Sequence, residues 1–90
     1  MKIAVCDDNR TILRKVHEEI DRCLDVIAPE KKPLVHIYEY GNGSSLLDAH
    51  VQVEFDIVFL DIEMPGLNGV EVARSLREYG SDVIIVIISS

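Results

Sequence analysis

The sequence predicts an α/β fold whose strands form a single parallel sheet. Short runs of apolar and β-branched residues alternate along the chain with longer segments in which apolar residues recur at helical spacing. The resulting order is β-α-β-α-β-α-β, and strands that are joined through helices lie parallel, with right-handed crossovers. The ninety residues contain no linker-like stretch and no repeat, so we expect one domain, residues 1–90, around one modest core.

The first helix is the longest predicted element. A strand-like run at residues 2–6 precedes it, and residues 10–27 follow a helical pattern with charged residues between the apolar ones. Pro29 and Pro33 bracket the polar stretch that ends this helix. Its apolar stripe consists of Leu13, Val16, Ile20, Leu24 and Ile27.

A second strand and a second, shorter helix come next. Residues 35–40 are rich in β-branched and aromatic residues, and the glycine-rich turn at residues 41–43 ends this strand. Ser45 and Asp48 lie three residues apart, which predicts a capping box at the start of the short helix.

The second half of the chain has the clearest pattern. Residues 55–60 are almost entirely apolar, as in a strand that is buried on both faces. Asn68 and Glu71 predict the N-cap of a helix over residues 69–79, and Gly80 predicts its left-handed C-terminal stop. We expect this helix to bury Val70, Ala73 and Leu76.

Charge and hydropathy exclude several functions. The net charge of −7 argues against non-specific binding to nucleic acid or to an anionic membrane, because both need clusters of Lys and Arg. The longest apolar run, residues 83–88, is far shorter than the ~18 residues that span a bilayer. Residues 1–6 are too short for a signal peptide. We therefore expect a cytoplasmic protein in which Cys6 and Cys23 are reduced, buried, small hydrophobic residues.

Polar side chains end three of the four predicted strands. Asp7 and Asp8 follow the first strand, Asp61 follows the third, and Ser89 follows the fourth, at residues 83–88. In open parallel sheets, ligands bind beyond the carboxyl ends of the strands where strand order reverses, as in the flavodoxin-like order 2-1-3-4-5. That order makes the first and third strands neighbours, so their carboxylates converge and repel one another. A divalent cation relieves this repulsion, and oxygen ligands alone suit Mg²⁺, or Mn²⁺, better than zinc.

Two segments of the chain resemble a known family. Residues 5–9, Val-Cys-Asp-Asp-Asn, resemble the first-strand acidic pair of the response-regulator receiver domains of bacterial two-component systems. Residues 55–69, with the pattern Leu60-Asp61-x-x-Met64-Pro65-Gly66-x-x-Gly69, resemble the third strand of these domains and the loop after it. The likeness extends over essentially all ninety residues. Residues 37–40 and 55–78 are more similar to receivers that precede LytTR-type DNA-binding domains than to other receivers.

The resemblance implies a role for each matching residue. Asp61 matches the phosphoacceptor, whose carboxylate takes a phosphoryl group from a phosphohistidine and becomes an acyl phosphate. Asp8 matches a direct metal ligand, and Asp7 matches the acid that holds metal-bound water. Glu63 matches the residue that ligates the metal through its backbone carbonyl, and Ser89 matches the switch hydroxyl that hydrogen-bonds the phosphoryl oxygen. The implied protein is a phosphoacceptor signalling domain and not a classical enzyme.

The resemblance also implies what surrounds the domain. A sensor histidine kinase would donate the phosphoryl group, and a C-terminal output domain that binds DNA would regulate transcription in the full-length protein. The implied fold is a flavodoxin-like (CheY-like) doubly wound sheet of order 2-1-3-4, without the fourth helix, fifth strand and fifth helix of a complete receiver. The fifth strand brings a lysine and a switch aromatic, and no lysine of this chain is placed to substitute. We interpret the chain as an incomplete receiver, and its uncovered fourth strand and sheet faces predict a homo-oligomer.

Simpler interpretations exist for the acidic residues. Asp7 and Asp8 could serve only as caps of the first helix, whose N-terminus favours negative charge. An idle carboxylate at Asp61 would be costly, because it ends a very apolar strand. The three histidines fall on different predicted elements, so we expect neither a metal cluster nor a phosphohistidine among them.

Rival functions fit the sequence less well. A HAD-type phosphohydrolase needs an acid two residues after its nucleophile, followed by Thr or Val, and residues 7–11, Asp-Asp-Asn-Arg-Thr, do not match. A flavodoxin needs a loop rich in Ser, Thr and Gly after the first strand, whereas the acidic loop of this chain would repel the FMN phosphate. The remaining alternative is a pseudo-receiver, an interaction module that keeps the fold without being switched by phosphate.

Overall fold

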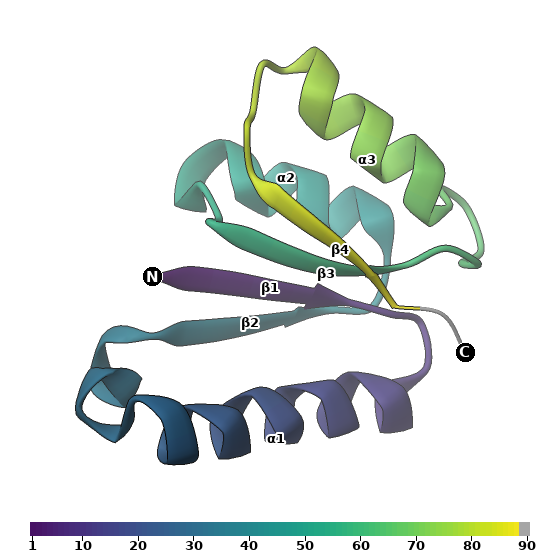
Figure 1. The fold of residues 1–90 in the computed structure, drawn as a ribbon. Helices are drawn as coiled ribbons and strands as arrows, with labels where there is room; N and C mark the ends of the chain where they lie inside the picture. Colours follow the sequence, from purple (N-terminus) through teal and green to yellow (C-terminus); the bar gives the residue numbers. More distant parts are fainter. Residues whose placement is uncertain (89–90) are drawn as a thin grey trace.

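A four-stranded parallel sheet with helices on both faces forms the protein, for which a computed structural model describes residues 1–88 (Figure 1). The strand order β2-β1-β3-β4 is the predicted one. Helix α1 covers one face of the sheet, and α2 and α3 cover the other. The strands are β1 (Lys2–Cys6), β2 (His36–Tyr40), β3 (Ile57–Asp61) and β4 (Ile84–Ile88). The helices are α1 (Arg10–Ile27), the 3₁₀ helix η1 (Pro29–Leu34), α2 (Gly43–Val53) and α3 (Gly69–Glu78).

The register of the sheet aligns the carboxyl ends of its strands. Cys6, the last residue of β1, pairs with Tyr40 at the end of β2 and with Leu60 near the end of β3. Asp61 pairs in turn with Ile88, the last residue of β4. Whatever follows each strand therefore emerges at one edge of the sheet, which is the edge where the sequence places its acidic residues.

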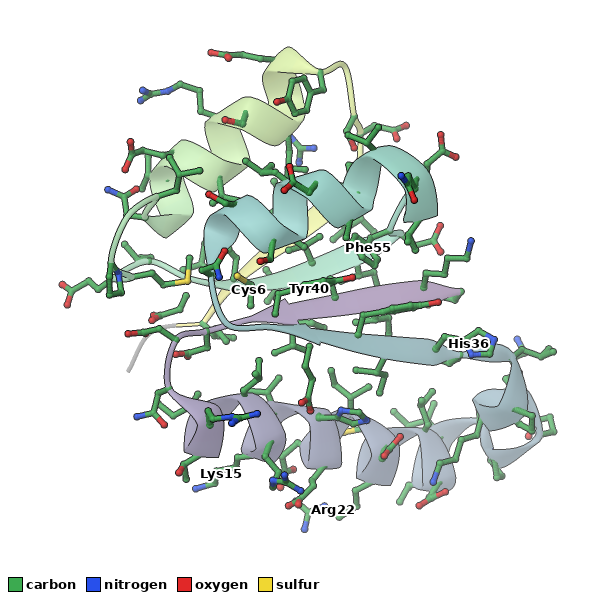
Figure 2. All side chains as sticks on the ribbon, turned by 180° about the vertical axis from the view of Figure 1, so that it is seen from behind. Cys6, Lys15, Arg22, His36, Tyr40 and Phe55 are labelled. Atoms are coloured by element: carbon green, nitrogen blue, oxygen red, sulfur yellow. The ribbon has the colours of Figure 1, made fainter. Side chains whose placement is uncertain are left out.

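The core lies between the sheet and helices α2 and α3. Phe55 packs edge-to-face against Tyr38 and Tyr40, with ring centroids 5.5 and 5.7 Å apart (Figure 2). Burial of this apolar surface stabilises the fold by roughly 25 cal/mol for each Å² removed from water. The side chains with no measurable exposure in this layer are Ala4, Cys6, Leu46, Val58, Leu60, Val72 and Leu76.

Helix α1 covers its face of the sheet only in part. Of its apolar stripe, Leu13 is buried, whereas Ile27 at the other end is 79% exposed. An apolar groove of about 580 Å³ runs between this helix and the strand residues Phe59 and Ile88. Cys23 lines the groove and is exposed, so the expectation that both cysteines are buried is wrong for Cys23 and correct for Cys6. Cys23 lies on the groove side of α1 with Ile20 and Leu24, and within residues 1–88 the groove beside it is open.

Two local predictions for α2 and α3 are also corrected. Helix α2 begins at Gly43 with Asn42 as its N-cap, and the Asn42 side chain accepts a hydrogen bond from the Ser45 N–H at 2.8 Å. The expected capping box at Ser45 is therefore wrong. In α3, Val70 is 52% exposed and Val72 is fully buried, because the helix turns its Val72 side toward α2 and the sheet.

The ends of α3 agree with the prediction. Asn68 and Glu71 form a reciprocal capping box, and Gly80 has a φ of +79°, the left-handed conformation expected of a C-terminal stop. Three strands begin one or two residues later than predicted, at His36, Ile57 and Ile84. Among the helices of residues 1–88, none combines the length and apolar character needed to cross a bilayer.

Candidate functional site

The acidic residues lie at the carboxyl ends of β1 and β3. These strands are neighbours, and the pairing of Cys6 with Leu60 puts Asp7 and Asp61 side by side one residue later. The Asp7 N–H donates to the Tyr40 carbonyl at 3.1 Å, which extends the sheet pairing to the residue that carries the carboxylate. The pairing of β1 with β2 and with β3 therefore fixes the backbone positions of Asp7 and Asp61.

Three carboxylates meet at this edge of the sheet. One oxygen each from Asp7, Asp8 and Asp61 lies within 4.8 Å of the other two. Asp7 is 2% exposed and Asp61 is 5% exposed, while Asp8 is open to solvent. The structure thus brings together the three residues that the sequence predicted to converge, with two of them buried and one at the rim.

Burial and neighbouring negative charge make Asp7 harder to ionise than an ordinary aspartate. Burial raises the pKa of Asp7, and the carboxylates of Asp61 and Asp8 raise it further. The Asn9 N–H donates to Asp7 Oδ1 at 2.9 Å, which offsets part of this effect. Burial, followed by the three neighbouring carboxylates, raises the pKa of the Cys6 thiol to about 12, so this residue stays protonated. A cation placed among the three carboxylates would reduce the repulsion between their negative charges.

The cap of α1 is a residue that sequence reasoning missed. Asn9 Oδ1 accepts hydrogen bonds from the N–H groups of Thr11 and Ile12, at 2.9 and 3.3 Å. Asparagine is a preferred N-cap residue, and its place directly before the helical pattern was the available signal. Because Asn9 satisfies the helix terminus, Asp7 and Asp8 are not needed as its caps.

The loop after β3 supplies the next predicted residue. The Glu63 side chain is exposed and is not among the carboxylates that converge at the strand ends. Met64 is buried, with its Sδ 3.7 Å from Cys6 Sγ, and this contact anchors the loop on the floor of the site. The predicted switch hydroxyl, Ser89, lies outside the described residues.

The histidines occupy separate parts of the fold, as predicted. Within residues 1–88 the only group of three or more candidate metal ligands is the acidic one already described, and it contains no histidine. His17 Nδ1 lies 2.7 Å from Glu39 Oε2, and its Nε2 lies 3.7 Å from Asp21 Oδ2, so it links α1 to β2. His36 is exposed at the start of β2.

His50 has a structural role that the sequence did not reveal. Its Nδ1 accepts a hydrogen bond from the Phe55 N–H at 3.1 Å, which leaves Nε2 to donate to Ser81 Oγ at 3.0 Å. The side chain thereby ties the end of α2 to the starts of β3 and β4, beside a cavity of about 620 Å³ at the opposite end of the sheet from the acidic group. A histidine in the last turn of a predicted helix was the only signal.

Comparisons with known proteins agree with this geometry. Residues 3–90 match the family model described as the response regulator receiver domain. The chain is 45% identical over 47 residues to the sensory transduction protein LytT of Oceanobacillus iheyensis, a match that covers 52% of this chain and 19% of that protein. It is 35% identical over 94 residues to the cyclic di-GMP phosphodiesterase response regulator RpfG of Xanthomonas campestris pv. campestris, covering 99% of this chain and 22% of that protein. The likeness to LytT agrees with the resemblance to LytTR-type regulators.

A solved structure supports the same family. The response regulator TrrA of Thermotoga maritima, in complex with Mg(2+)-BeF, matches with a TM-score of 0.78 and 31% identity, over 98% of this chain and 68% of that chain. The matched segments therefore span about a fifth of the length of the two curated relatives and about two thirds of the solved one. By its family match, its strand order and the acidic group at its strand ends, the chain belongs to the response regulator receiver domain family of two-component systems.

Proposed function

We propose that this domain is a phosphoacceptor in which Asp61 takes up a phosphoryl group. The observation that carries the proposal is the convergence of three carboxylates, from Asp7, Asp8 and Asp61, at the ends of adjacent strands. A buried carboxylate that serves no purpose is costly, and two of these three are buried. Their arrangement is that expected of a site that holds a cation and a phosphoryl group together.

The donor set fits Mg²⁺, with Mn²⁺ as a substitute. All of its side-chain ligand atoms are carboxylate oxygens, which hard divalent cations prefer. We assign Asp7, Asp8 and Asp61 to this site, together with the backbone carbonyl of Glu63. The TrrA relative, which was solved with Mg(2+)-BeF, supports the assignment. The cation would neutralise negative charge on the phosphoryl oxygens during transfer.

The residues of the chain account for the remaining chemistry. An oxygen of Asp61 attacks the phosphorus of a phosphohistidine, so that an O–P bond forms while the N–P bond breaks and the imidazole leaves. Asp7 and Asp8 would hold the cation beside this oxygen, and Ser89 is assigned the hydrogen bond to a phosphoryl oxygen. The protein mainly supplies alignment and a preorganised electrostatic environment. The domain would promote its own phosphorylation and dephosphorylation without being an enzyme in the ordinary sense.

The implied partners follow from this role. We propose a sensor histidine kinase as the phosphoryl donor and a DNA-binding output domain in the full-length, cytoplasmic protein. Residues 1–90 would be its single receiver domain, which itself binds neither nucleic acid nor membrane. We also propose that the ninety-residue chain forms a homo-oligomer through β4 and the uncovered faces of the sheet, because among residues 1–88 β4 has a partner strand on one side only.

Mg²⁺-dependent gain of one phosphoryl group is the direct test of the function. The chain is incubated with acetyl phosphate, with and without Mg²⁺, and its intact mass is measured. We expect a species heavier by a single phosphoryl group only when Mg²⁺ is present, and NMR shifts around Asp61 when beryllofluoride replaces the phosphate. No gain in mass and no beryllofluoride shifts would support the pseudo-receiver alternative.

Mg²⁺ binding is expected with a dissociation constant of roughly millimolar or lower, as judged by an NMR titration. The amides of residues 6–9 and 61–64 should move first. Affinity should fall with falling pH, beginning at a higher pH than for an ordinary aspartate, because the pKa of Asp7 is raised and protonated Asp7 no longer attracts the cation. Shifts confined to the exposed acids Glu18, Glu19 and Asp21 would contradict the assignment.

The raised pKa of Asp7 also predicts how the metal-free protein responds to pH. The folded state binds this proton more tightly than the unfolded chain does. The contribution of Asp7 to the free energy of unfolding therefore increases as the pH falls through its folded-state pKa. Saturating Mg²⁺ should weaken or reverse this trend, because the cation stabilises the ionised carboxylates.

A further inference from the structure

The first residue of α3 lies directly against the main chain of Asp61. Gly69 is buried, and its N–H donates to the Ile62 carbonyl at 2.8 Å. A Cβ at Gly69 would lie 2.8 Å from Ile62 Cα and 2.9 Å from the Asp61 carbonyl carbon, and closer still to the Asp61 carbonyl oxygen. Real Cβ atoms essentially never approach other atoms within 3.0 Å. Only glycine therefore fits at this position unless the backbone moves.

Neither β3 nor α3, the two elements that meet at Gly69, is free to move away from the other. Strand β3 pairs with β1 over residues 57–60 on one side and with β4 over residues 57–61 on the other. Helix α3 is held by Val72 and Leu76, which are fully buried, and its first turn is fixed by the capping box. A side chain at Gly69 would therefore displace the part of the structure with the fewest constraints, which is the peptide that joins the end of β3 to the loop.

We propose that Gly69 is a positioning residue for the acidic site: by lacking a side chain, it lets α3 rest on the Asp61–Ile62 peptide and fixes the backbone from which the Asp61 carboxylate projects. This inference rests on the proposed function of Asp61. Gly69 touches neither a ligand nor the reacting atoms, and it acts through Asp61. A small displacement of the Asp61–Ile62 peptide would move the Asp61 carboxylate away from those of Asp7 and Asp8. It would also move the backbone carbonyl of Glu63, which follows Asp61 by two residues.

Gly43 supplies a matched control. It is the first residue of α2, as Gly69 is the first residue of α3, and it is also buried. A Cβ at Gly43 would lie 2.5 Å from Val72 Cγ2 in α3, and 3.2 and 3.3 Å from Leu67 Cβ and the Leu67 carbonyl oxygen in the loop before α3, so its one severe collision is with the Val72 side chain. Alanine at either glycine should destabilise the fold, but only alanine at Gly69 should move the backbone of Asp61.

The experiment compares Gly69→Ala and Gly43→Ala by Mg²⁺ titration and by chemical denaturation. We expect Gly69→Ala to weaken Mg²⁺ binding by about 10- to 100-fold, the usual effect of disturbing the residues that orient metal ligands. Gly43→Ala should lower the unfolding midpoint yet keep the Mg²⁺ affinity within about twofold of the original, because its collisions lie outside the site. Equal affinities in the two variants and the original chain would overturn the positioning role.

A measurement on the unaltered chain covers the case in which Gly69→Ala does not fold. During Mg²⁺ titration the Gly69 amide should shift together with the Glu63 amide, because the Gly69 N–H donates to the Ile62 carbonyl of the same peptide group, while the Gly43 amide stays in place. An unmoved Gly69 amide would overturn the proposal even if the metal binds. Failure of the original chain to bind Mg²⁺ at all would instead overturn the proposed metal site, and the positioning role with it.

Discussion

Replacing Asp61 with asparagine is expected to reduce Mg²⁺-dependent phosphoryl uptake to background while leaving the fold intact. The amide is almost the same size as the carboxylate, but its oxygen is too weak a nucleophile to attack phosphorus. The substitution also removes one of three negative charges that lie within 4.8 Å of one another. Because these charges repel, Asp61→Asn should melt at the same temperature as the original chain or higher when no metal is present.

Asp56→Asn is the matched control for this substitution. Asp56 lies just before β3, at the opposite end of the strand from Asp61, and its Oδ2 accepts a hydrogen bond from the Lys2 N–H at 2.8 Å. Asparagine keeps a carbonyl oxygen that can accept the same bond. This variant should take up phosphate like the original chain, so any loss in Asp61→Asn can be assigned to the site.

Intact mass after incubation with acetyl phosphate and Mg²⁺ provides the readout. Mapping of the modified residue, after the acyl phosphate is trapped chemically, identifies the acceptor. If Asp61→Asn still gains a phosphoryl group as readily as the original chain, at a residue other than Asp7 or Asp8, the acceptor has been misassigned.

The ninety-residue chain is expected to self-associate at micromolar concentration. Strand β4 is an edge strand whose backbone groups on one side have no partner strand among residues 1–88. Ile84, Val86 and Ile87 on this strand are 60%, 37% and 45% exposed. Natural edge strands are usually blunted by charge, proline or a bulge, and residues 84–88 contain no charged residue and no proline.

The apolar groove beside α1 is a second exposed surface that favours self-association. The apolar groove between α1 and the β3–β4 part of the sheet has a volume of about 580 Å³ and includes Phe59 and Ile88. Phe59 pairs with Val86, so the Val86 side chain lies on the same face of the sheet as the groove. A second copy of the chain could cover both at once, and burial of each Å² would contribute roughly 25 cal/mol.

Light scattering coupled to size-exclusion chromatography tests this expectation. The original chain should elute as a dimer or larger species, and Val86→Lys should shift it toward the monomer because a charge then lies in the uncovered apolar face. Val26→Lys is the control, since Val26 is 79% exposed at the far end of α1 and does not line the groove. A stable monomer of 10.1 kDa that melts sharply and cooperatively would show that β4 and the groove do not drive association.

The element order and the identity of the acidic site could be predicted from the sequence because both depend on short-range patterns. The alternation of apolar runs with helical stripes predicted the order β-α-β-α-β-α-β. Strands that are connected through helices pair in parallel, so Asp7, Asp8 and Asp61 were expected at the same edge of the sheet, where they lie. The capping box at Asn68 was equally local, because all of its hydrogen bonds join residues at most three positions apart.

Only the tertiary structure decided which residues are buried and what lies beside the site. A helical stripe defines only a broad face, so the sequence pattern predicted Val70 in the core, whereas the packing of α3 on α2 and the sheet buries Val72 instead. Cys23 has the spacing of a buried residue but borders a groove that nothing in residues 1–88 fills. The contact of Gly69 with the Asp61–Ile62 peptide was likewise invisible in the sequence, because a glycine carries no side chain to signal what it approaches. Burial and close approach depend on three-dimensional neighbours, and no local pattern specifies these.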